Sequence, residues 1–231
     1  MGLFDDKIRN YFIIVGCNYT NLSGCVNDAY LMYNLFKKND NNRIILFIDK
    51  EKKVLKEEIK KSIIEIHKEN NLSNIPYRII FTFAGHGYTH GSIQLSDCRV
   101  SCNELYNLLN SDSCNNFEVI IILDSCYSGG FTNLGTYGNI SKTTIITSCN
   151  SSQKSVESVA TIDCNNNNFK KLDCFNNNND NFYTGIFTYN FTNIVEKLLI
   201  KKKKITLENI FNNSIWNTIS IIGKQTYQIK K

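Results

Sequence analysis

Residues 118–123 read EVIIIL and run directly into residues 124–130, DSCYSGG. The first six are almost all β-branched or apolar, so we expect a strand that is buried on both faces of a parallel sheet. The Cys126 that follows comes before a Ser-Gly-Gly turn, at a strand end where open parallel sheets bind their ligands. Residues 143–147 repeat the same strand pattern.

The rest of the chain alternates expected strands with expected helices. Further strands are predicted at 11–15, 43–48, 77–83 and 226–229, and helices at 28–38, 54–67, 101–109, 187–200 and 206–221. The third of these helices opens with Ser101 and Glu104 at the spacing of a capping box. This alternation predicts an α/β fold with a mostly parallel, doubly wound sheet and right-handed connections.

Composition and charge exclude several classes of protein. A chain of 231 residues with 42% hydrophobic content can bury a core, and a net charge of +5 is too small to indicate a nucleic-acid binder. The apolar run at 119–123 is far shorter than the roughly 20 residues of a membrane span. The first residues also lack a secretory signal, so we expect a cytoplasmic protein that starts near Met1 and has neither nucleic acid nor membrane as partner.

The chain is rich in cysteine. Its nine cysteines are Cys17, Cys25, Cys98, Cys102, Cys114, Cys126, Cys149, Cys164 and Cys174. Without a signal peptide they indicate free thiols in a reducing compartment. One close pair with no second pair does not make a zinc site, so most are expected to pack as small hydrophobic residues.

Two polar stretches follow the fifth expected strand. The region after Ser148 is rich in asparagine as far as about Asn181, which predicts a loop. The run of lysines at 201–204 follows an expected helix, where cations complement the helix dipole. We interpret that run as a solvated helix end in preference to a nucleic-acid site.

A cysteine and a histidine at two strand ends form the candidate catalytic pair. His86 lies between two glycines after the strand at 77–83, and Cys126 follows the strand at 118–123. Because the carboxyl ends of parallel strands share one edge, His86 can act as base for a Cys126 nucleophile. The alternative interpretation is that Cys126 is a buried structural thiol and that His86 is a turn residue unrelated to it. His67 and His90 are weaker candidates, since the first lies in an amphipathic helix and the second in a loop.

At these residues the chain resembles the metacaspases, within the wider group of caspase-like cysteine peptidases. The motifs are FAGHG at 83–87, LDSCYSGG at 123–130, and GCNY and GCVNDA at 16–19 and 24–29, with weaker similarity at 145–149 and 185–189. The resemblance implies one caspase-like domain over 1–231, a three-layer sandwich with a mostly parallel six-stranded sheet and helices on both faces. Its large portion would reach about 150, an Asn-rich processing loop would occupy 151–182, and a small portion would follow at 183–231.

The resemblance also implies a reaction. Cys126 would attack the scissile carbonyl, His86 would serve as acid and base, and the backbone amides of Gly87 and Cys126 would hold the oxyanion. Asp28 and Asp124 correspond to acids that select Arg or Lys before the cut. Each acid has a structural alternative, because Asp28 could cap a helix and Asp124 could accept loop amides.

Other positions complete or alter this pattern. Cys25 and Ala84 would line the same pocket, although Ala84 stands where the family usually has Ser and Tyr127 replaces a frequent His. Many metacaspases bind calcium through an acidic cluster, but Asp97 is the one acid between His86 and the helix at 101–109, and 131–138 contains none. We therefore expect no metal site, no required cofactor and no strict calcium dependence.

The resemblance further implies self-cleavage and leaves two other functions open. Lys154, Lys170 and Lys171 are the candidate cleavage sites in or near the Asn-rich segment. The expected partners are protein or peptide substrates with Arg or Lys at the cut, and the expected state is a monomer. The alternatives are a catalytically silent caspase-like interaction module and an Asp-directed enzyme, which would need basic pocket residues.

Overall fold

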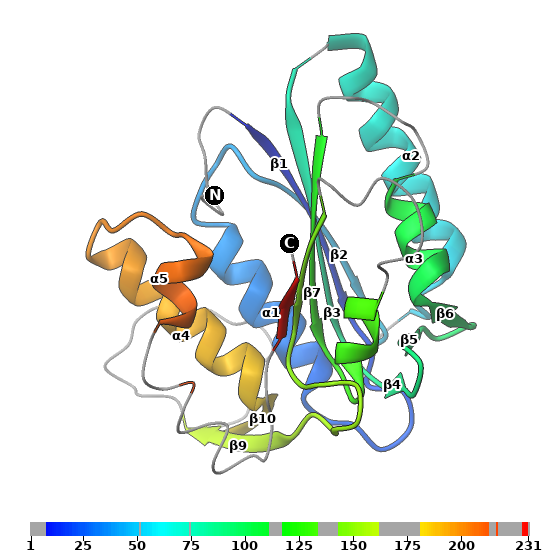
Figure 1. Cartoon of the computed structure of the whole chain (residues 1–231), viewed down its shortest axis with the longest axis vertical. Coiled ribbons are helices and arrows are strands. Elements are labelled where there is room, and N and C mark those ends of the chain that lie inside the picture. Colours follow the sequence, from blue (N-terminus) through cyan, green and yellow to red (C-terminus); the bar gives the residue numbers. More distant parts are fainter. Residues whose placement is uncertain are drawn as a thin grey trace.

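The computed structural model describes residues 8–50, 52–73, 75–110, 117–133, 143–161, 181–212, 216 and 228–230. Six strands form the central sheet in the order β11-β8-β7-β3-β1-β2 (Figure 1). They are β1 (Arg9–Gly16), β2 (Arg43–Ile48), β3 (Tyr77–Ala84), β7 (Phe117–Asp124), β8 (Thr143–Thr147) and β11 (Gln228–Lys230). All neighbours are parallel except β11, which pairs antiparallel with β8. The predicted mostly parallel six-stranded sheet is confirmed.

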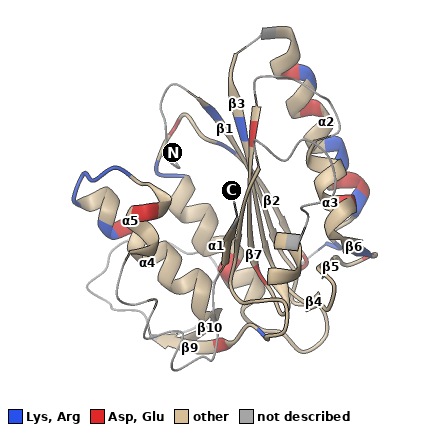
Figure 2. Cartoon of the chain, viewed as in Figure 1, with Lys and Arg blue, Asp and Glu red and all other residues tan. Residues whose placement is uncertain are grey.

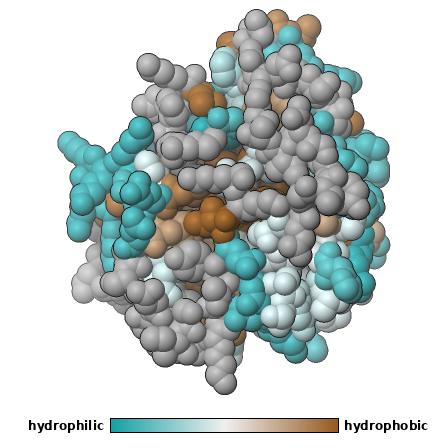
Figure 3. All heavy atoms as spheres, in the orientation of Figure 1, coloured by the Kyte–Doolittle hydropathy of each residue, from teal (hydrophilic) through white to brown (hydrophobic). Residues whose placement is uncertain are grey.

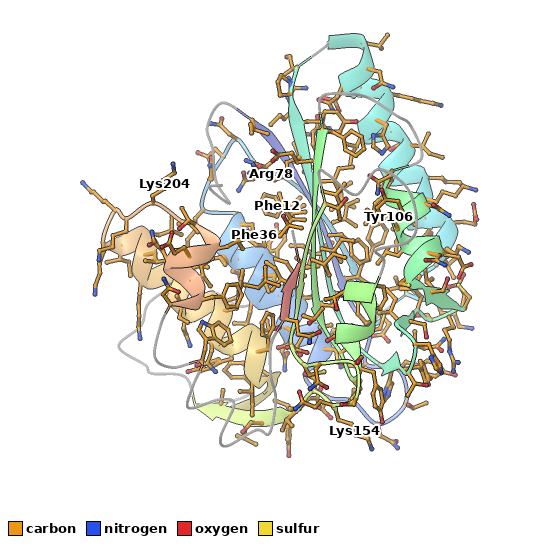
Figure 4. All side chains as sticks on the ribbon, viewed as in Figure 1. Phe12, Phe36, Arg78, Tyr106, Lys154 and Lys204 are labelled. Atoms are coloured by element: carbon orange, nitrogen blue, oxygen red, sulfur yellow. The ribbon has the colours of Figure 1, made fainter. Side chains whose placement is uncertain are left out.

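Helices cover both faces of the sheet, as predicted. Figure 1 shows α1 (Cys25–Phe36), α4 (Ile186–Ile200) and α5 (Leu207–Phe211) on one side, and α2 (Lys56–Ser73) and α3 (Cys102–Leu109) on the other. Because side chains alternate along a strand, β1 sends Phe12 toward Phe36 of α1, with ring centroids 4.1 Å apart, and Ile13 toward the α2 side. Figure 4 shows Phe12 and Phe36 together on one face and Tyr106 of α3 on the other.

Smaller elements surround the sheet. They are a three-stranded sheet of β4 (Gly87–Tyr88), β5 (Ser92–Gln94) and β6 (Arg99–Ser101), a 3-10 helix η1 (Ser128–Asn133), and an antiparallel pair of β9 (Glu157–Thr161) and β10 (Asn181–Gly185). The β9 strand corrects the prediction of a loop throughout 151–182. It forms because Ala160 and its cross-strand partner Phe182 are buried against Leu31 of α1. Residues 162–180 lie outside the described part of the chain.

The helix boundaries also differ from the predictions in places. The helix predicted at 54–67 extends to Ser73, and the one predicted from Asp28 begins at Cys25. Of the helix predicted at 206–221, the structure describes α5 and Trp216, and the rest lies outside the described residues. The capping box at Ser101 and Glu104 is confirmed. In the part of the chain that the structure describes, no helix is both long and apolar enough to span a bilayer.

The register of the central strands brings three loops to one level. Gly16 at the end of β1 pairs with Ala84 at the end of β3, and Ala84 pairs in turn with Asp124 at the end of β7. The loops that carry the sequence motifs therefore leave the sheet side by side. This edge holds the candidate site.

Candidate active site

One cleft at the carboxyl edge of the sheet collects the main candidate residues. It has about 320 Å³ of free space, part of it open to solvent. Its lining includes Cys25, Asp28, His86, Asp124 and Cys126. Residues that are 101 positions apart in the sequence thus meet because β1, β3 and β7 are neighbours in the sheet.

Cys126 is held in a tight turn between β7 and η1. The next residue, Tyr127, has φ +57° and donates its backbone N–H to the carbonyl of Gln153 at 2.7 Å. The Cys126 Sγ is half-buried and lies 3.9 Å from the carbonyl oxygen of Ser155. Burial raises the pKa of the Cys126 thiol, so the resting side chain carries its proton.

His86 is positioned by the end of β3 and by a residue of the loop after β1. Its Nε2 lies 3.1 Å from the Oγ1 of Thr20, within hydrogen-bond distance. Thr20 has φ +57°, a conformation that threonine rarely adopts. Thr20 is a site residue that was not predicted from the sequence, where its place in the loop after the first strand is the one available signal.

Gly87 allows the histidine loop to approach the cysteine loop. A Cβ at position 87 would lie 2.0 Å from the Cys126 carbonyl oxygen, so no side chain fits there. The Gln94 N–H donates to the His86 carbonyl at 2.9 Å, which makes Gly87 and Ile93 a non-hydrogen-bonded pair in the described β4–β5 ladder. The Gly87 amide is therefore not used by that ladder and can donate to another group.

Two of the residues that line the cleft are buried carboxylates, and both contact the N-terminal end of α4. Asp28 accepts hydrogen bonds from the Thr184 hydroxyl and, at 2.9 Å, from the Gly185 N–H. Asp124 accepts from the Thr188 N–H at 3.0 Å and from the Ser155 hydroxyl at 2.5 Å. The helix dipole and these donors stabilise negative charge in an otherwise apolar setting.

The two carboxylates face each other across Gly185. A Cβ on this glycine would lie 2.2 Å from Asp124 Oδ2 and 3.1 Å from Asp28 Oδ2. Burial raises the pKa of Asp28 well above its usual value, and repulsion from Asp124 adds to this effect. Burial also raises the pKa of Asp124, although its hydrogen bonds oppose the shift. Neither acid has the structural role considered from the sequence: Asp28 lies inside α1 and accepts the Gly185 N–H before α4, and Asp124 accepts a helix N–H, that of Thr188, in place of loop amides.

A third acid, Glu157 of β9, completes the lining of the cleft. Its Oε1 accepts the Gly24 N–H at 3.0 Å and lies 3.5 Å from Cys25 Sγ. Burial, together with the charges of Asp28 and Glu157, raises the pKa of Cys25 well above its usual value. Sequence reasoning missed Glu157 because it placed this position in a loop.

The other predicted site residues lie in different surroundings. Ala84 is buried beside a small inner cavity that it shares with Asp28 and Asp124. Lys154 is exposed on the segment that leads to Ser155, and Figure 4 shows it at the end of the molecule that bears β9. Lys170 and Lys171 lie outside the described residues.

Among the residues that the structure describes, no group of three or more His, Cys, Asp or Glu side chains is placed to hold a metal ion. Asp97, the acid after the histidine motif, instead accepts the Lys56 N–H at 3.3 Å at the start of α2. Asp97 thus accepts a hydrogen bond from the first N–H group of α2, as a helix-capping side chain does.

A mostly parallel sheet with helices on both faces, and with a thiol and an imidazole at its carboxyl edge, is the arrangement expected of a cysteine peptidase. Residues 9–213 match the family model of the caspase domain. The chain therefore belongs to the family of caspase-like cysteine peptidases.

A solved structure shows the same fold. Caspase-1 from Spodoptera frugiperda has a TM-score of 0.62 and 13% sequence identity, over 97% of this chain and 87% of that chain. At this identity the likeness concerns the fold alone. A comparison with curated protein sequences finds no match.

Proposed function

We propose that the chain is a cysteine endopeptidase of the metacaspase type that cleaves peptide bonds after Arg or Lys. The observation that carries the proposal is the set of three carboxylates, Asp28, Asp124 and Glu157, in the cleft that also holds His86 and Cys126. Among the described residues that line this cleft there is no Lys or Arg. An Asp-directed enzyme would need such a cation, so the charge of the cleft favours a basic substrate residue.

In the proposed reaction the Cys126 sulfur attacks the scissile carbonyl carbon while its proton passes to His86. The amides of Gly87 and Cys126 donate to the oxyanion that forms. His86 then gives the proton to the leaving amine, and the C–N bond breaks to leave a thioester on Cys126. Water, deprotonated by His86, hydrolyses the thioester and restores the thiol.

The raised pKa values of the buried acids support selection of a cation. Without substrate, ionising both Asp28 and Asp124 is unfavourable because they are buried and repel each other. A guanidinium or ammonium group beside them would offset this repulsion and donate charge-assisted hydrogen bonds to the carboxylates. Cleavage after Arg is therefore expected to weaken at acidic pH, where the carboxylates become protonated.

The direct test uses fluorogenic peptides that end in Arg, Lys or Asp. We expect cleavage of the Arg and Lys peptides and complete loss of cleavage in Cys126→Ala. Cleavage of the Asp peptide instead would contradict the proposed specificity. No cleavage of any peptide by well-folded protein would favour the silent interaction module.

The third acid gives a sharper test of specificity. Glu157→Gln keeps the shape of the side chain and its ability to accept the Gly24 N–H, but removes one charge from the cleft. We expect kcat/KM for the Arg peptide to fall about 5- to 30-fold, which corresponds to the loss of one charge-assisted contact. Glu65→Gln, at an exposed position of α2, is the matched control. An unchanged kcat/KM in Glu157→Gln would remove Glu157 from the specificity pocket.

Self-processing is part of the proposal, and contacts of the described residues argue against Lys154 as the site of the cut. The residues on either side of Lys154 are held in place, since the Gln153 carbonyl accepts the Tyr127 N–H and the Ser155 hydroxyl donates to Asp124. A cut there would dismantle the pocket. We therefore propose Lys170 or Lys171, between β9 and β10, and expect the double variant Lys170→Gln, Lys171→Gln to stay intact during incubation. Mass spectrometry of the products checks this, and continued cutting at 154 would contradict it.

We also propose that activity does not strictly require calcium. A chelator such as EDTA is expected to leave cleavage of the Arg peptide unchanged. An enzyme that stays silent until millimolar calcium is added would overturn this expectation.

A further inference from the structure

The C-terminal end of α4 exposes apolar side chains next to a run of lysines. The earlier turns of this helix bury Phe187, Phe191 and Val195 in the core. The last turn instead leaves Leu199 36% and Ile200 71% exposed. The next four residues, Lys201–Lys204, are all exposed. We call residues 199–204 the lysine turn.

The backbone of the lysine turn is fixed by hydrogen bonds. The Lys203 N–H donates to the Leu198 carbonyl and the Lys202 N–H to the Leu199 carbonyl, both at 2.9 Å. Lys202 has φ +50°. These two bonds and the left-handed residue form a Schellman motif, whose left-handed position usually holds glycine. The four lysines thus leave the helix in a defined turn.

Further lysines extend this positive surface. Lys38, just after α1, pairs with Glu196 of α4, so the C-terminal ends of the two helices lie together. Lys37 and Lys197 are exposed at these same ends. Figure 2 shows the blue lysines gathered around the turn between α4 and α5, and Figure 3 shows hydrophilic surface over the same part of the molecule.

We propose that the lysine turn is a docking surface for anionic lipid bilayers. The lysines would meet the headgroups, and the Leu199 and Ile200 side chains would enter the boundary between headgroups and acyl chains. This proposal departs from the expectation of no membrane partner, which rested on hydropathy and could not show that these two apolar residues are exposed.

The same observation distinguishes a bilayer from a nucleic acid. Non-specific binding to a phosphate backbone is mainly electrostatic, so exposed Leu199 and Ile200 would add little affinity there. The turn has lysines only, whereas base recognition favours arginine and stacking aromatic residues. An apolar tip beside clustered cations is typical of a surface that binds lipid.

The position of the turn leaves the cleft accessible. The helix α4 begins at Ile186, next to Gly185 of the cleft, and its 15 residues span about 22 Å at 1.5 Å per residue. A bilayer at the far end of α4 would therefore not cover His86 or Cys126. The proposal does not depend on the proposed peptidase activity.

The test measures cosedimentation with vesicles of phosphatidylcholine alone or with about one third phosphatidylserine. The full chain carries Cys126→Ala so that self-cleavage cannot remove the turn. The test variant changes Lys201, Lys202, Lys203 and Lys204 to Gln. The matched control changes Lys52, Lys53, Lys60 and Lys61 to Gln, which removes the same charge from α2 and the segment just before it, on the opposite face of the sheet.

We expect binding to the phosphatidylserine vesicles only, and a loss on the order of 1,000-fold when the four lysines of the turn are replaced. The control should bind as the parent does. Ile200→Ser, which keeps every charge, should weaken lipid binding without changing any binding to a duplex DNA probe. Absence of vesicle binding, equal losses in the two lysine variants, or an Ile200→Ser variant that binds vesicles normally would each overturn the proposal.

Discussion

The Thr20 hydroxyl contacts the imidazole of His86, the proposed base. A hydrogen bond to Nε2, 3.1 Å from Thr20 Oγ1, fixes the ring orientation and influences which nitrogen carries the proton. We regard Thr20 as a positioning residue, because its side chain contacts the histidine and not the nucleophile.

Replacement of Thr20 tests this role. Thr20→Val keeps the shape of the side chain and removes the hydroxyl, so we expect kcat for the Arg peptide to fall about 10-fold with little change in KM. Thr20→Ser should recover most of the activity. The acid limb of the pH profile of kcat should also shift in the Val variant. A loss that appears only in thermal stability would assign Thr20 a structural role.

The reactivity of Cys126 follows from its burial. Because burial raises the pKa of the Cys126 thiol above its ordinary value of about 8.5, the thiolate is a minor form at neutral pH and increases as pH rises. We expect the rate of iodoacetamide labelling at Cys126 to keep rising beyond pH 8.5. A plateau near pH 7 would indicate a preformed ion pair with the imidazole and would contradict this expectation.

The other cysteines serve as the comparison. Cys17 is fully buried, and burial raises its pKa to about 12, while Cys25 is buried beside acids. Low concentrations of reagent should therefore label Cys126 before either of them and stop turnover in parallel. Uniform labelling of all cysteines without loss of activity would exclude Cys126 as the nucleophile.

At the scale of single elements, local patterns decided which predictions succeeded. The strand at 118–123 could be predicted because a continuous β-branched run has no amphipathic alternative. The strand β9 could not, because its pairing partner lies beyond 19 mostly polar residues, and its burial depends on Leu31 of a distant helix. The hydropathy pattern of one segment does not show which distant segment it will pair with or pack against.

The capping box of α3 is an element whose contribution can be measured. The Ser101 hydroxyl accepts the Glu104 N–H, and the Glu104 carboxylate accepts the Ser101 N–H at 2.9 Å and the Lys56 Nζ at 3.0 Å. We expect Ser101→Ala to lower the free energy of unfolding by about 1 kcal/mol, measured by urea denaturation. Ser151→Ala, at an exposed serine outside any helix, should stay within about 0.5 kcal/mol of the parent.

The same cap has a defined pH dependence. Its hydrogen bonds lower the pKa of Glu104 to about 2, below the unfolded value of about 4.3. A carboxylate with a lowered folded pKa stabilises the fold above its unfolded pKa, and that contribution is lost as pH falls from about 4 toward 2. Ser101→Ala should therefore differ from the parent less at pH 2.5 than at pH 7. A difference that grows at low pH would contradict this assignment.

At the scale of the whole molecule, the site could be predicted only where the sheet itself assembles it. His86, Asp124 and Cys126 follow neighbouring parallel strands, so their sequence positions were sufficient to place them together. Glu157 enters the cleft from β9, and the N-terminal end of α4 supplies donors to Asp28 and Asp124. These contributions come from outside the strand ends and depend on the packing of β9, β10 and α4 against α1.

That packing predicts what happens when the chain is cut between β9 and β10. The two pieces would share the β9–β10 ladder, the β8–β11 pairing and the contact of α1 with α4. Phe187, Phe191 and Ile194 of α4 are buried in the same core as α1, and each contributes about 2 kcal/mol. We expect the pieces from self-cleavage or limited trypsin digestion to elute together in size-exclusion chromatography and to separate only in denaturant. The assembled pieces should still cleave the Arg peptide, because His86 and Cys126 lie on one piece while Gly185 and Thr188 of the other hold the pocket acids. Pieces that separate under native conditions, with activity lost in proportion, would show that the covalent connection between β9 and β10 holds the pocket together.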